Sequence, residues 1–360
     1  MLVVVSTTVF LALFEFAVSL FWYSETYGDT CMEDHLEMGY VHRKNCVSKI
    51  KQPEGEMVEY KYNACGFRND NFECWPEREK IVVLSIGDSF SEGAMVNENE
   101  MYTKVAEKIL RSNGHDIVYV NAGVSGYDLL QYYQITNILL QQYRPDVVLI
   151  GLLPNDLLGE IDLSEIEKRK KLYSQTSRQD SYAKINLRTE DRLNLFYKIK
   201  KIITGTYTGH LITHGLLRID SIYYTAYLAK SDKGSYLDRK YSEIWNSKLI
   251  DAGTILNRIN ERAKSVDAKF MVVAIPQRIQ ALLVSGKYEV KDKNAHELVK
   301  KLRKITSESG FPITDFLDDL DGVSNATEYY YVVDGHLTPE GHALLGQHVA
   351  INLNQILNDK

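Results

Sequence analysis

The sequence is poor in the residues that mark several common classes of protein. The net charge is −6, so no excess of positive charge indicates a nucleic-acid partner. Neither an internal repeat nor a low-complexity tract occurs in the 360 residues. The four cysteines include no Cys-x-x-Cys pair, which argues against a zinc site. What remains is ordinary globular composition, with 44% hydrophobic residues and enough length for one large core.

Positive charge is also missing from the start of the chain, where no Lys or Arg precedes Arg43. The positive-inside rule therefore cannot assign an orientation to a membrane segment here. The basic region and small-residue cleavage site of a signal peptide are also missing. Residues 2–23 are nearly all apolar, with Glu15 near their middle, and about 20 apolar residues are enough to cross a bilayer. We expect an uncleaved transmembrane anchor over residues 1–24, with a buried core helix as the alternative.

All four cysteines, Cys31, Cys46, Cys65 and Cys74, fall in one short window behind this segment. Such clustering predicts two disulfides and an oxidising compartment. Three connectivities are possible, and proximity alone favours Cys31–Cys46 with Cys65–Cys74; four unpaired thiols are the alternative. Together with the anchor, the cysteines predict a membrane-anchored protein whose main domain is extracytoplasmic, in the periplasm or outside the cell.

The most informative stretch that is present is Gly87-Asp88-Ser89-Phe90-Ser91-Glu92-Gly93, directly behind the apolar run 81–86. A buried strand that ends in such a turn places a hydroxyl at the carboxyl edge of a sheet, where open α/β sheets bind ligands. Ser89 is therefore a candidate nucleophile, favoured by the N-terminus of the helix that follows. The alternative is ordinary turn chemistry, and Asp88 is expected to bond to turn amides in either case.

Two further apolar runs end in polar turns. The run that begins at Val118 ends at Gly126, whose backbone N–H can approach a ligand because no Cβ stands in the way. The run that begins at Asp146 ends at Asn155, whose amide can donate hydrogen bonds. With the N–H of Ser89, these groups predict a three-donor oxyanion hole.

A serine hydroxyl needs a neighbouring base, and that base needs a third group to fix its tautomer. His336 lies just before a predicted helix that starts at Thr338-Pro339, so we assign it as the base. Asp334, two residues earlier, is assigned to orient its ring. The alternatives are a surface histidine without a catalytic role and a backbone carbonyl in place of Asp334. His342 and His348 are interpreted as packing or solvated positions.

At these four segments the chain resembles the SGNH/GDSL hydrolase family of serine esterases. The serine, glycine, asparagine and histidine blocks of that family match in order and spacing over residues 60–160 and 265–358. Two positions depart from the usual pattern. Leu153 stands where the asparagine block has a glycine, and Asp334-x-His336 is one residue shorter than the common Asp-x-x-His. Some relatives that modify polysaccharides share the shorter spacing.

Strands that alternate with helices predict a three-layer α/β/α sandwich around a parallel, flavodoxin-like sheet. The expected strands are 81–86, 116–121, 146–151, 269–275 and 312–316. The expected helices are 99–112, 127–143, 247–265, 294–308 and 339–357. The predicted domains are the anchor, a Cys-containing extension over 25–79, a hydrolase domain over 80–159 and 246–360, and a helical insertion or lid over 160–245.

The predicted insertion is basic and rich in tyrosine. Between residues 161 and 203 we count 11 Lys and Arg against 6 Asp and Glu, an excess of 5. One interpretation is a lid that lines an acyl or sugar pocket, since aromatic faces suit sugars. The alternative is a solvated helical subdomain with partly buried tyrosines.

The family resemblance implies a serine esterase that cleaves ester-linked acyl groups through an acyl-enzyme on Ser89, with no cofactor and no metal. O-acetyl groups on cell-surface glycans are the expected substrates, and lipid esters come next. An O-acyltransferase that moves acetyl groups onto a polysaccharide would use the same residues, because the acyl-enzyme is shared. A non-catalytic glycan-binding or export protein is the third hypothesis.

Overall fold

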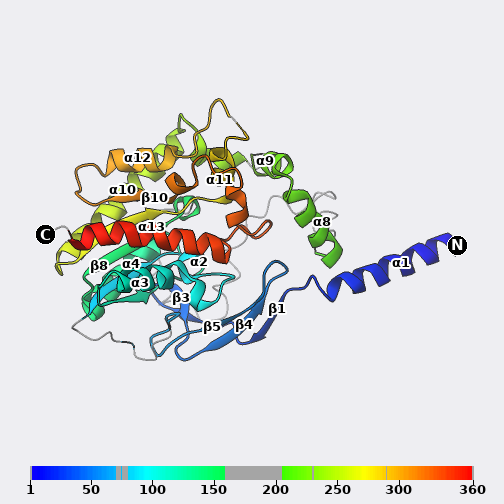
Figure 1. Cartoon of the computed structure of the whole chain (residues 1–360), viewed down its shortest axis with the longest axis horizontal. Coiled ribbons are helices and arrows are strands. Elements are labelled where there is room, and N and C mark those ends of the chain that lie inside the picture. Colours follow the sequence, from blue (N-terminus) through cyan, green and yellow to red (C-terminus); the bar gives the residue numbers. More distant parts are fainter. Residues whose placement is uncertain are drawn as a thin grey trace.

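A parallel sheet of five strands lies at the centre of the protein (Figure 1). The structure is a computed structural model, and it describes residues 2–69, 74, 80–158, 205–228, 231–288 and 290–358. The sheet order is β10-β9-β8-β6-β7, and every neighbouring pair runs parallel. The strands are β6 (Ile81–Ile86), β7 (Ile117–Asn121), β8 (Val147–Leu152), β9 (Lys269–Ala274) and β10 (Ile313–Asp315). This is the flavodoxin-like order, and all five strands were predicted.

The strands are buried on both faces, as their unbroken apolar sequences require. Successive side chains of a strand point to opposite faces, so one face of the sheet takes Leu84 and Val148 while the other takes Val83 and Leu149. Each face is covered by helices that bury a separate apolar cluster. The sheet is therefore the middle layer of three.

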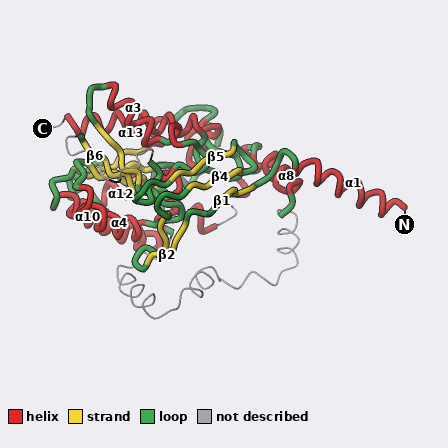
Figure 2. The backbone as a smooth tube through the Cα atoms, turned by 90° about the horizontal axis from the view of Figure 1, so that it is seen from below, coloured by secondary structure: helices red, strands yellow, loops and turns green. Residues whose placement is uncertain are grey.

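Figure 2 shows the two outer layers on either side of the sheet. On one side α3 (Tyr102–Ser112) packs along α13 (Pro339–Asn358), and on the other α4 (Leu129–Tyr143) packs along α10 (Glu243–Lys264). These helices were predicted to within a few residues at each end. The other α-helices in the described residues of this domain are the short α2 (Ser89–Glu92), α11 (Arg278–Val284) and α12 (Glu297–Ile305).

The predicted Cys-containing extension forms two small antiparallel sheets that the sequence reading did not assign. One has the order β1-β4-β5, and the other is the hairpin β2-β3. The strands are β1 (Glu25–Gly28), β2 (Met32–His35), β3 (Gly39–His42), β4 (Val47–Lys51) and β5 (Met57–Lys61). Disulfides join Cys31 to Cys46 and Cys65 to Cys74, which is the pairing that proximity favoured.

The predicted transmembrane anchor over residues 1–24 is not supported. Residues Leu2–Ser19 form the helix α1, but no helix in the described part of the chain is long and apolar enough to cross a membrane. The alternative, a buried core helix, is wrong, because α1 projects from the body and Val3 and Phe10 are 75% and 65% exposed (Figure 1).

The acidic residue inside this apolar helix has a structural partner. The carboxylate of Glu15 accepts hydrogen bonds from the backbone N–H groups of Tyr207 (2.6 Å) and Thr208 (2.9 Å). These groups open the helix α8 (Tyr207–Leu217), where unpaired N–H groups and the helix dipole favour a negative charge. Glu15 therefore ties α1 to α8.

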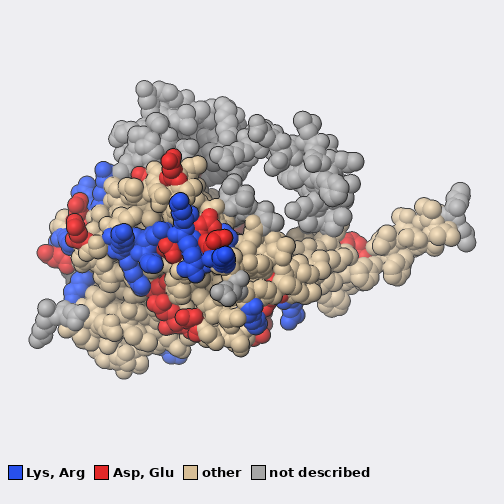
Figure 3. All heavy atoms as spheres, turned by 90° about the horizontal axis from the view of Figure 1, so that it is seen from above, with Lys and Arg blue, Asp and Glu red and all other residues tan. Residues whose placement is uncertain are grey.

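The described part of the predicted insertion is mostly helical. After α8 come α9 (Asp220–Leu228) and the 3-10 helix η3 (Ser231–Leu237). The basic stretch between residues 161 and 203 lies outside the described residues. On the face seen in Figure 3, Lys and Arg side chains lie among Asp and Glu side chains, so charges of both signs mix there.

Candidate active site

The turn that follows β6 is fixed by its own sequence. The Asp88 side chain caps α2 by accepting a hydrogen bond from the Phe90 N–H (2.9 Å). A Cβ on Gly87 would lie 2.1 Å from Ser91 Oγ, so only glycine fits there. Gly93 ends the short helix in the left-handed conformation, with a φ of 82°. Ser89 is thereby held at the carboxyl edge of the sheet, beside the point where the strand order reverses.

The loop before α13 brings an imidazole to this serine. His336 Nε2 lies 2.7 Å from Ser89 Oγ, within hydrogen-bonding distance. Its other ring nitrogen, Nδ1, bonds to the carboxylate of Asp334, which also accepts from the His336 backbone N–H at 3.3 Å. The three predicted side chains therefore meet across 247 residues of sequence, and a carboxylate rather than a backbone carbonyl orients the ring.

The charges around His336 favour its protonated form. Burial acts to lower its pKa, but the hydrogen bond and charge of Asp334, together with Asp88 and Glu92, raise the pKa above its ordinary value of 6.5. Burial of Asp334 is in turn outweighed by His336, which lowers the pKa of that carboxyl. The pair is therefore suited to hold a proton taken from Ser89.

Asn155 and Gly126 lie at the same edge of the sheet. The amide of Asn155 is exposed, and Nδ2 lies 3.3 Å from Asp88 Oδ2, directly beside the serine turn. Gly126 is exposed and has a φ of +79°, which favours glycine. Its turn rests on the serine turn, because a Cβ on Gly123 would lie 2.4 Å from the backbone N of Glu92.

The two other aspartates of the site, Asp88 and Asp156, are buried and accept hydrogen bonds from backbone N–H groups. Asp88 is 2% exposed, and burial raises the pKa of its carboxyl. Asp156 is 1% exposed and accepts hydrogen bonds from the Leu153 N–H (2.8 Å) and the Tyr132 hydroxyl (2.9 Å). Asp156 thus caps the short 3-10 helix Pro154–Leu157.

A buried carboxylate connects the serine turn to the glycine turn. Glu92 Oε2 accepts hydrogen bonds from the backbone N–H (2.8 Å) and the hydroxyl of Ser125. Glu92 Oε1 accepts from the Tyr62 hydroxyl (2.5 Å) and lies 3.2 Å from His42 Nε2. Burial would raise the pKa of Glu92, but the charge of His42 and these hydrogen bonds lower it to about 2. Glu92 is thus ionised, and it fixes the residue next to Gly126.

Arg68 supports the serine turn from the other side. Its guanidinium is 1% exposed and donates to the backbone carbonyls of Glu92 (3.1 Å), Gly93 and Val96 (2.6 Å). The same group lies 4.1 Å above the ring of Tyr60. Arg68 therefore binds three carbonyls at the end of the helix α2 and just after it.

A cleft of about 340 Å³ opens beside these residues, within the usual size range of small-ligand sites. Phe90, Asn155 and the loop 332–335 line it from the hydrolase domain. The insertion lines it with the rings of Tyr223 and Tyr227. The structure therefore favours the interpretation of the described insertion as a wall of the pocket.

Gln277 also belongs to this site, although no role was assigned to its side chain from the sequence. Its Nε2 donates to Asn155 Oδ1 (3.1 Å), and its Oε1 accepts from the hydroxyls of Tyr236 (3.1 Å) and Tyr227. This chain of bonds fixes which side of the Asn155 amide carries the donor. The only signal in the sequence is the position of Gln277, shortly after the end of a predicted strand.

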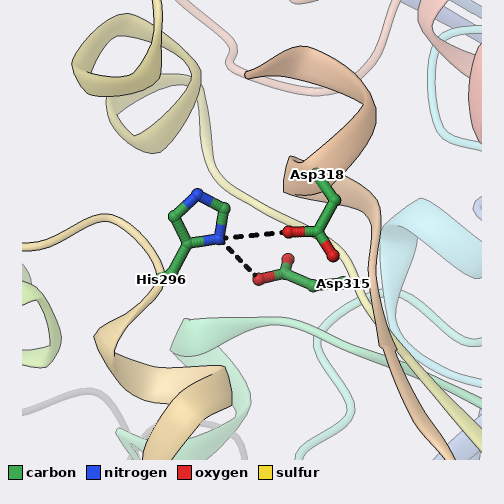
Figure 4. Close-up of side chains that lie close together, drawn as sticks. All are labelled: His296, Asp315 and Asp318. Atoms are coloured by element: carbon green, nitrogen blue, oxygen red, sulfur yellow. Dashed lines mark hydrogen bonds and ion pairs between the residues drawn. The ribbon is translucent and has the colours of Figure 1, made fainter.

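One group among the described residues could share a metal ion, and Figure 4 shows it. His296 Nδ1 lies 3.0 Å from Asp315 Oδ2 and 3.5 Å from Asp318 Oδ1. The hydrogen bond that His296 donates to the carboxylate of Asp315 raises the pKa of His296, so the ring can carry the compensating positive charge itself. An ion-pair cluster accounts for this arrangement.

In α/β proteins, a serine bonded to an imidazole that is itself bonded to a carboxylate, all at the edge of the sheet, is typical of a serine hydrolase. A family model shows which family of serine hydrolases is concerned. The model of the GDSL-like lipase/acylhydrolase family matches residues 85–344, which include every predicted catalytic and oxyanion residue. The chain belongs to this family of ester hydrolases, as the resemblance predicted.

Several solved structures of esterases are similar to this chain at low sequence identity. The esterase EstA of Pseudoalteromonas sp. is 13% identical, with a TM-score of 0.43 over 78% of this chain and 100% of that one. A family 3 carbohydrate esterase of Clostridium thermocellum is 12% identical, with a TM-score of 0.41 over 77% and 98%. An acetyl xylan esterase is 11% identical, with a TM-score of 0.43 over 76% and 99%. No curated protein sequence matches the chain.

Proposed function

We propose that the protein is a serine esterase in which Ser89 carries the acyl group. His336 Nε2 takes the proton of the Ser89 hydroxyl as Oγ bonds to the ester carbonyl carbon, and returns it to the leaving alcohol. Water then attacks the acyl-enzyme, again giving its proton to His336, and releases the acid with Ser89 restored. The 2.7 Å contact between Ser89 and His336 is the observation that carries this proposal.

The oxyanion of each tetrahedral intermediate is assigned to three donors. These are the backbone N–H groups of Ser89 and Gly126 and the side-chain amide of Asn155. Asn155 Nδ2 lies 3.3 Å from Asp88, longer than a typical bond, so a small turn of the amide directs it to substrate. Its bond with Gln277 keeps the donor on the correct side during that turn.

The substrate class proposed is an O-acetyl ester on a cell-surface glycan. The aromatic rings of Tyr223 and Tyr227 in the cleft support this choice, because sugars stack on such faces. Lipid esters are the second choice. An O-acyltransferase would differ only in using a sugar hydroxyl in place of water, and a non-catalytic glycan-binding or export protein would use the cleft without turnover.

Purified protein mixed with an acetylated glycan tests the substrate class. We expect acetate to be released from the glycan, and nitrophenyl acetate to be cleaved at least tenfold faster than nitrophenyl decanoate. Preference for the decanoate would favour lipid esters. Transfer of acetyl groups from nitrophenyl acetate to a deacetylated glycan, without free acetate, would favour an acyltransferase.

The pH dependence of ester hydrolysis follows from the charges around His336. Only the neutral ring accepts a proton, and the pKa of His336 is raised above 6.5, so kcat/KM is expected to fall as the pH drops through a value above 6.5. Replacing Asp334 by Asn removes the group that raises this pKa. The variant is expected to lose about 10²–10⁴-fold in kcat/KM, and its remaining activity to persist to lower pH. An Asp334→Asn profile that keeps the wild-type midpoint would contradict the assigned orienting role.

We also propose that the protein works outside the cytoplasm, in the periplasm or beyond the cell. The two disulfides support this location, because such bonds persist in oxidising compartments. Titration of the denatured, unreduced protein with a thiol reagent is the test. Protein isolated from its native compartment should show no free thiol, and four free thiols would contradict the proposal.

A further inference from the structure

The turn between β4 and β5 carries a buried carboxylate, Glu54, that the mechanism does not use. Glu54 is 7% exposed and lies in the Cys-containing extension, far from the catalytic loop in sequence. The turn itself is held by Lys51, whose ammonium group donates to the backbone carbonyls of Gln52 (2.6 Å) and Gly55 (2.7 Å). The bonds of Lys51 therefore fix the turn from which the Glu54 side chain projects.

Three consecutive backbone N–H groups of the catalytic loop converge on Glu54. Oε1 accepts from Val332 (2.9 Å), and Oε2 accepts from Val333 (2.8 Å) and Asp334 (2.8 Å). A curled loop that points successive N–H groups at one place forms a binding concavity for an anion. Here the anion is supplied by the chain itself, 278 to 280 residues earlier in the sequence.

Within the loop, the Tyr331 N–H donates to the His336 carbonyl (2.8 Å) and the Gly335 N–H donates to the Tyr331 carbonyl (3.0 Å). Val333 is 37% exposed, and Gly335 has a φ of +89° in the turn that leads to His336. The other contacts of the loop include a bond from Arg278 Nη1 to the Val332 carbonyl (2.7 Å). Glu54 therefore holds the backbone of the segment from which both Asp334 and His336 project.

We propose that Glu54 is a positioning residue for catalysis, through which the N-terminal extension completes the active site. This inference rests on the proposed esterase function. Glu54 does not touch the reacting atoms, but sets the place of Asp334 and hence the ring of His336 against Ser89. A displacement of about 1 Å in such a group costs about 10²-fold in rate.

The substitution Glu54→Gln keeps the size and shape of the side chain but replaces one of its two acceptor oxygens by an NH₂ group. The side-chain NH₂ of Gln cannot accept, so at least one of the three loop N–H groups loses its partner and faces another donor. The bonds that remain also lose their charge assistance. We expect kcat for nitrophenyl acetate to fall about 30- to 100-fold, while KM changes less than about threefold.

The matched control is Glu56→Gln, which removes the same charge from an exposed position of the same turn. It is expected to stay within twofold of wild type. The one-dimensional proton NMR spectrum supplies a second readout, because the Nδ1 proton shared by His336 and Asp334 gives a far-downfield signal. That signal should move or broaden in Glu54→Gln and stay in place in Glu56→Gln. A merely structural role for Glu54 would lower the unfolding temperature without changing kcat per folded molecule or this signal.

The outcomes separate this inference from the function on which it rests. Wild-type protein that neither hydrolyses esters nor reacts at Ser89 would overturn the proposed function. Active wild type with a Glu54→Gln variant within twofold of it in kcat, and with an unchanged signal, would overturn the role of Glu54. Should Glu54→Gln fail to fold, Glu54→Asp carries the test with the same readouts. It keeps the charge but is one methylene too short to reach all three N–H groups.

Discussion

Replacing Ser89 by Ala is expected to reduce kcat/KM for ester hydrolysis by about 10⁵-fold. The variant lacks the oxygen that forms the acyl-enzyme, and neither His336 nor Asp334 can supply another. The residual rate comes from the oxyanion donors and from substrate binding, which the substitution leaves in place. Initial rates with nitrophenyl acetate, measured above and below the KM of wild type, give the size of the loss.

The fold should survive this change. Ser89 is only partly buried, and losing one hydroxyl of this kind costs about 1 kcal/mol. The exposed Ser112 at the end of α3 offers a matched control, and Ser112→Ala is expected to retain full activity. A Ser89→Ala protein that folds and turns over ester at the wild-type rate would remove Ser89 from the mechanism.

Replacing Arg68 by Ala is expected to lower the free energy of unfolding by about 3–5 kcal/mol. Three backbone carbonyls lose a charged donor inside the protein, and each such bond contributes about 1.5–3 kcal/mol before the neighbours relax. The lost side chain also leaves a cavity against Tyr60. Urea denaturation followed by circular dichroism measures the change.

Arg262 provides the control for this experiment, because it is an exposed arginine on α10. Arg262→Ala should shift the free energy of unfolding by less than about 0.5 kcal/mol. Arg68→Lys should fall between wild type and Arg68→Ala, since a single ammonium group cannot serve three carbonyls with the geometry of a guanidinium. An Arg68→Ala variant within 1 kcal/mol of wild type would show that the guanidinium contributes little to holding the serine turn.

The central sheet could be predicted from the sequence because its strands are unbroken apolar runs. A strand such as Val147–Leu152 is buried on both faces, so its unbroken apolar run identifies it as a central strand. The helices between successive strands indicate that the strands run parallel. The relay of Ser89, His336 and Asp334 could be predicted for a related reason. Each residue directly follows a strand or precedes a helix whose position was already clear.

The supports of the site could not be predicted, because they depend on contacts between distant segments. Nothing around Glu54 indicates that its carboxylate meets the N–H groups of Val332 and Asp334. Gln277 has a role only because Tyr227 and Tyr236 of the insertion are folded over it. The strands β1–β5 escaped notice because each has only four or five residues, too few to show a clear period.

The N-terminal helix shows the limit of composition as a guide. Apolar composition over residues 2–23 indicated a membrane span, but no described helix is long and apolar enough to cross a membrane. Glu15, near the middle of that segment, accepts hydrogen bonds from the first two N–H groups of α8. Composition alone does not reveal such a partner 192 residues away.

Covalent labelling with a fluorophosphonate probe tests the central claim most directly, because such probes react with serines activated by a neighbouring base. The tryptic peptide from Ile81 to Lys104 contains Ser85, Ser89 and Ser91, and its fragment ions distinguish the three. We predict a single adduct on Ser89, formed in wild type and lost in both Ser89→Ala and His336→Ala. An adduct on another residue, or equal labelling of wild type and Ser89→Ala, would contradict the account.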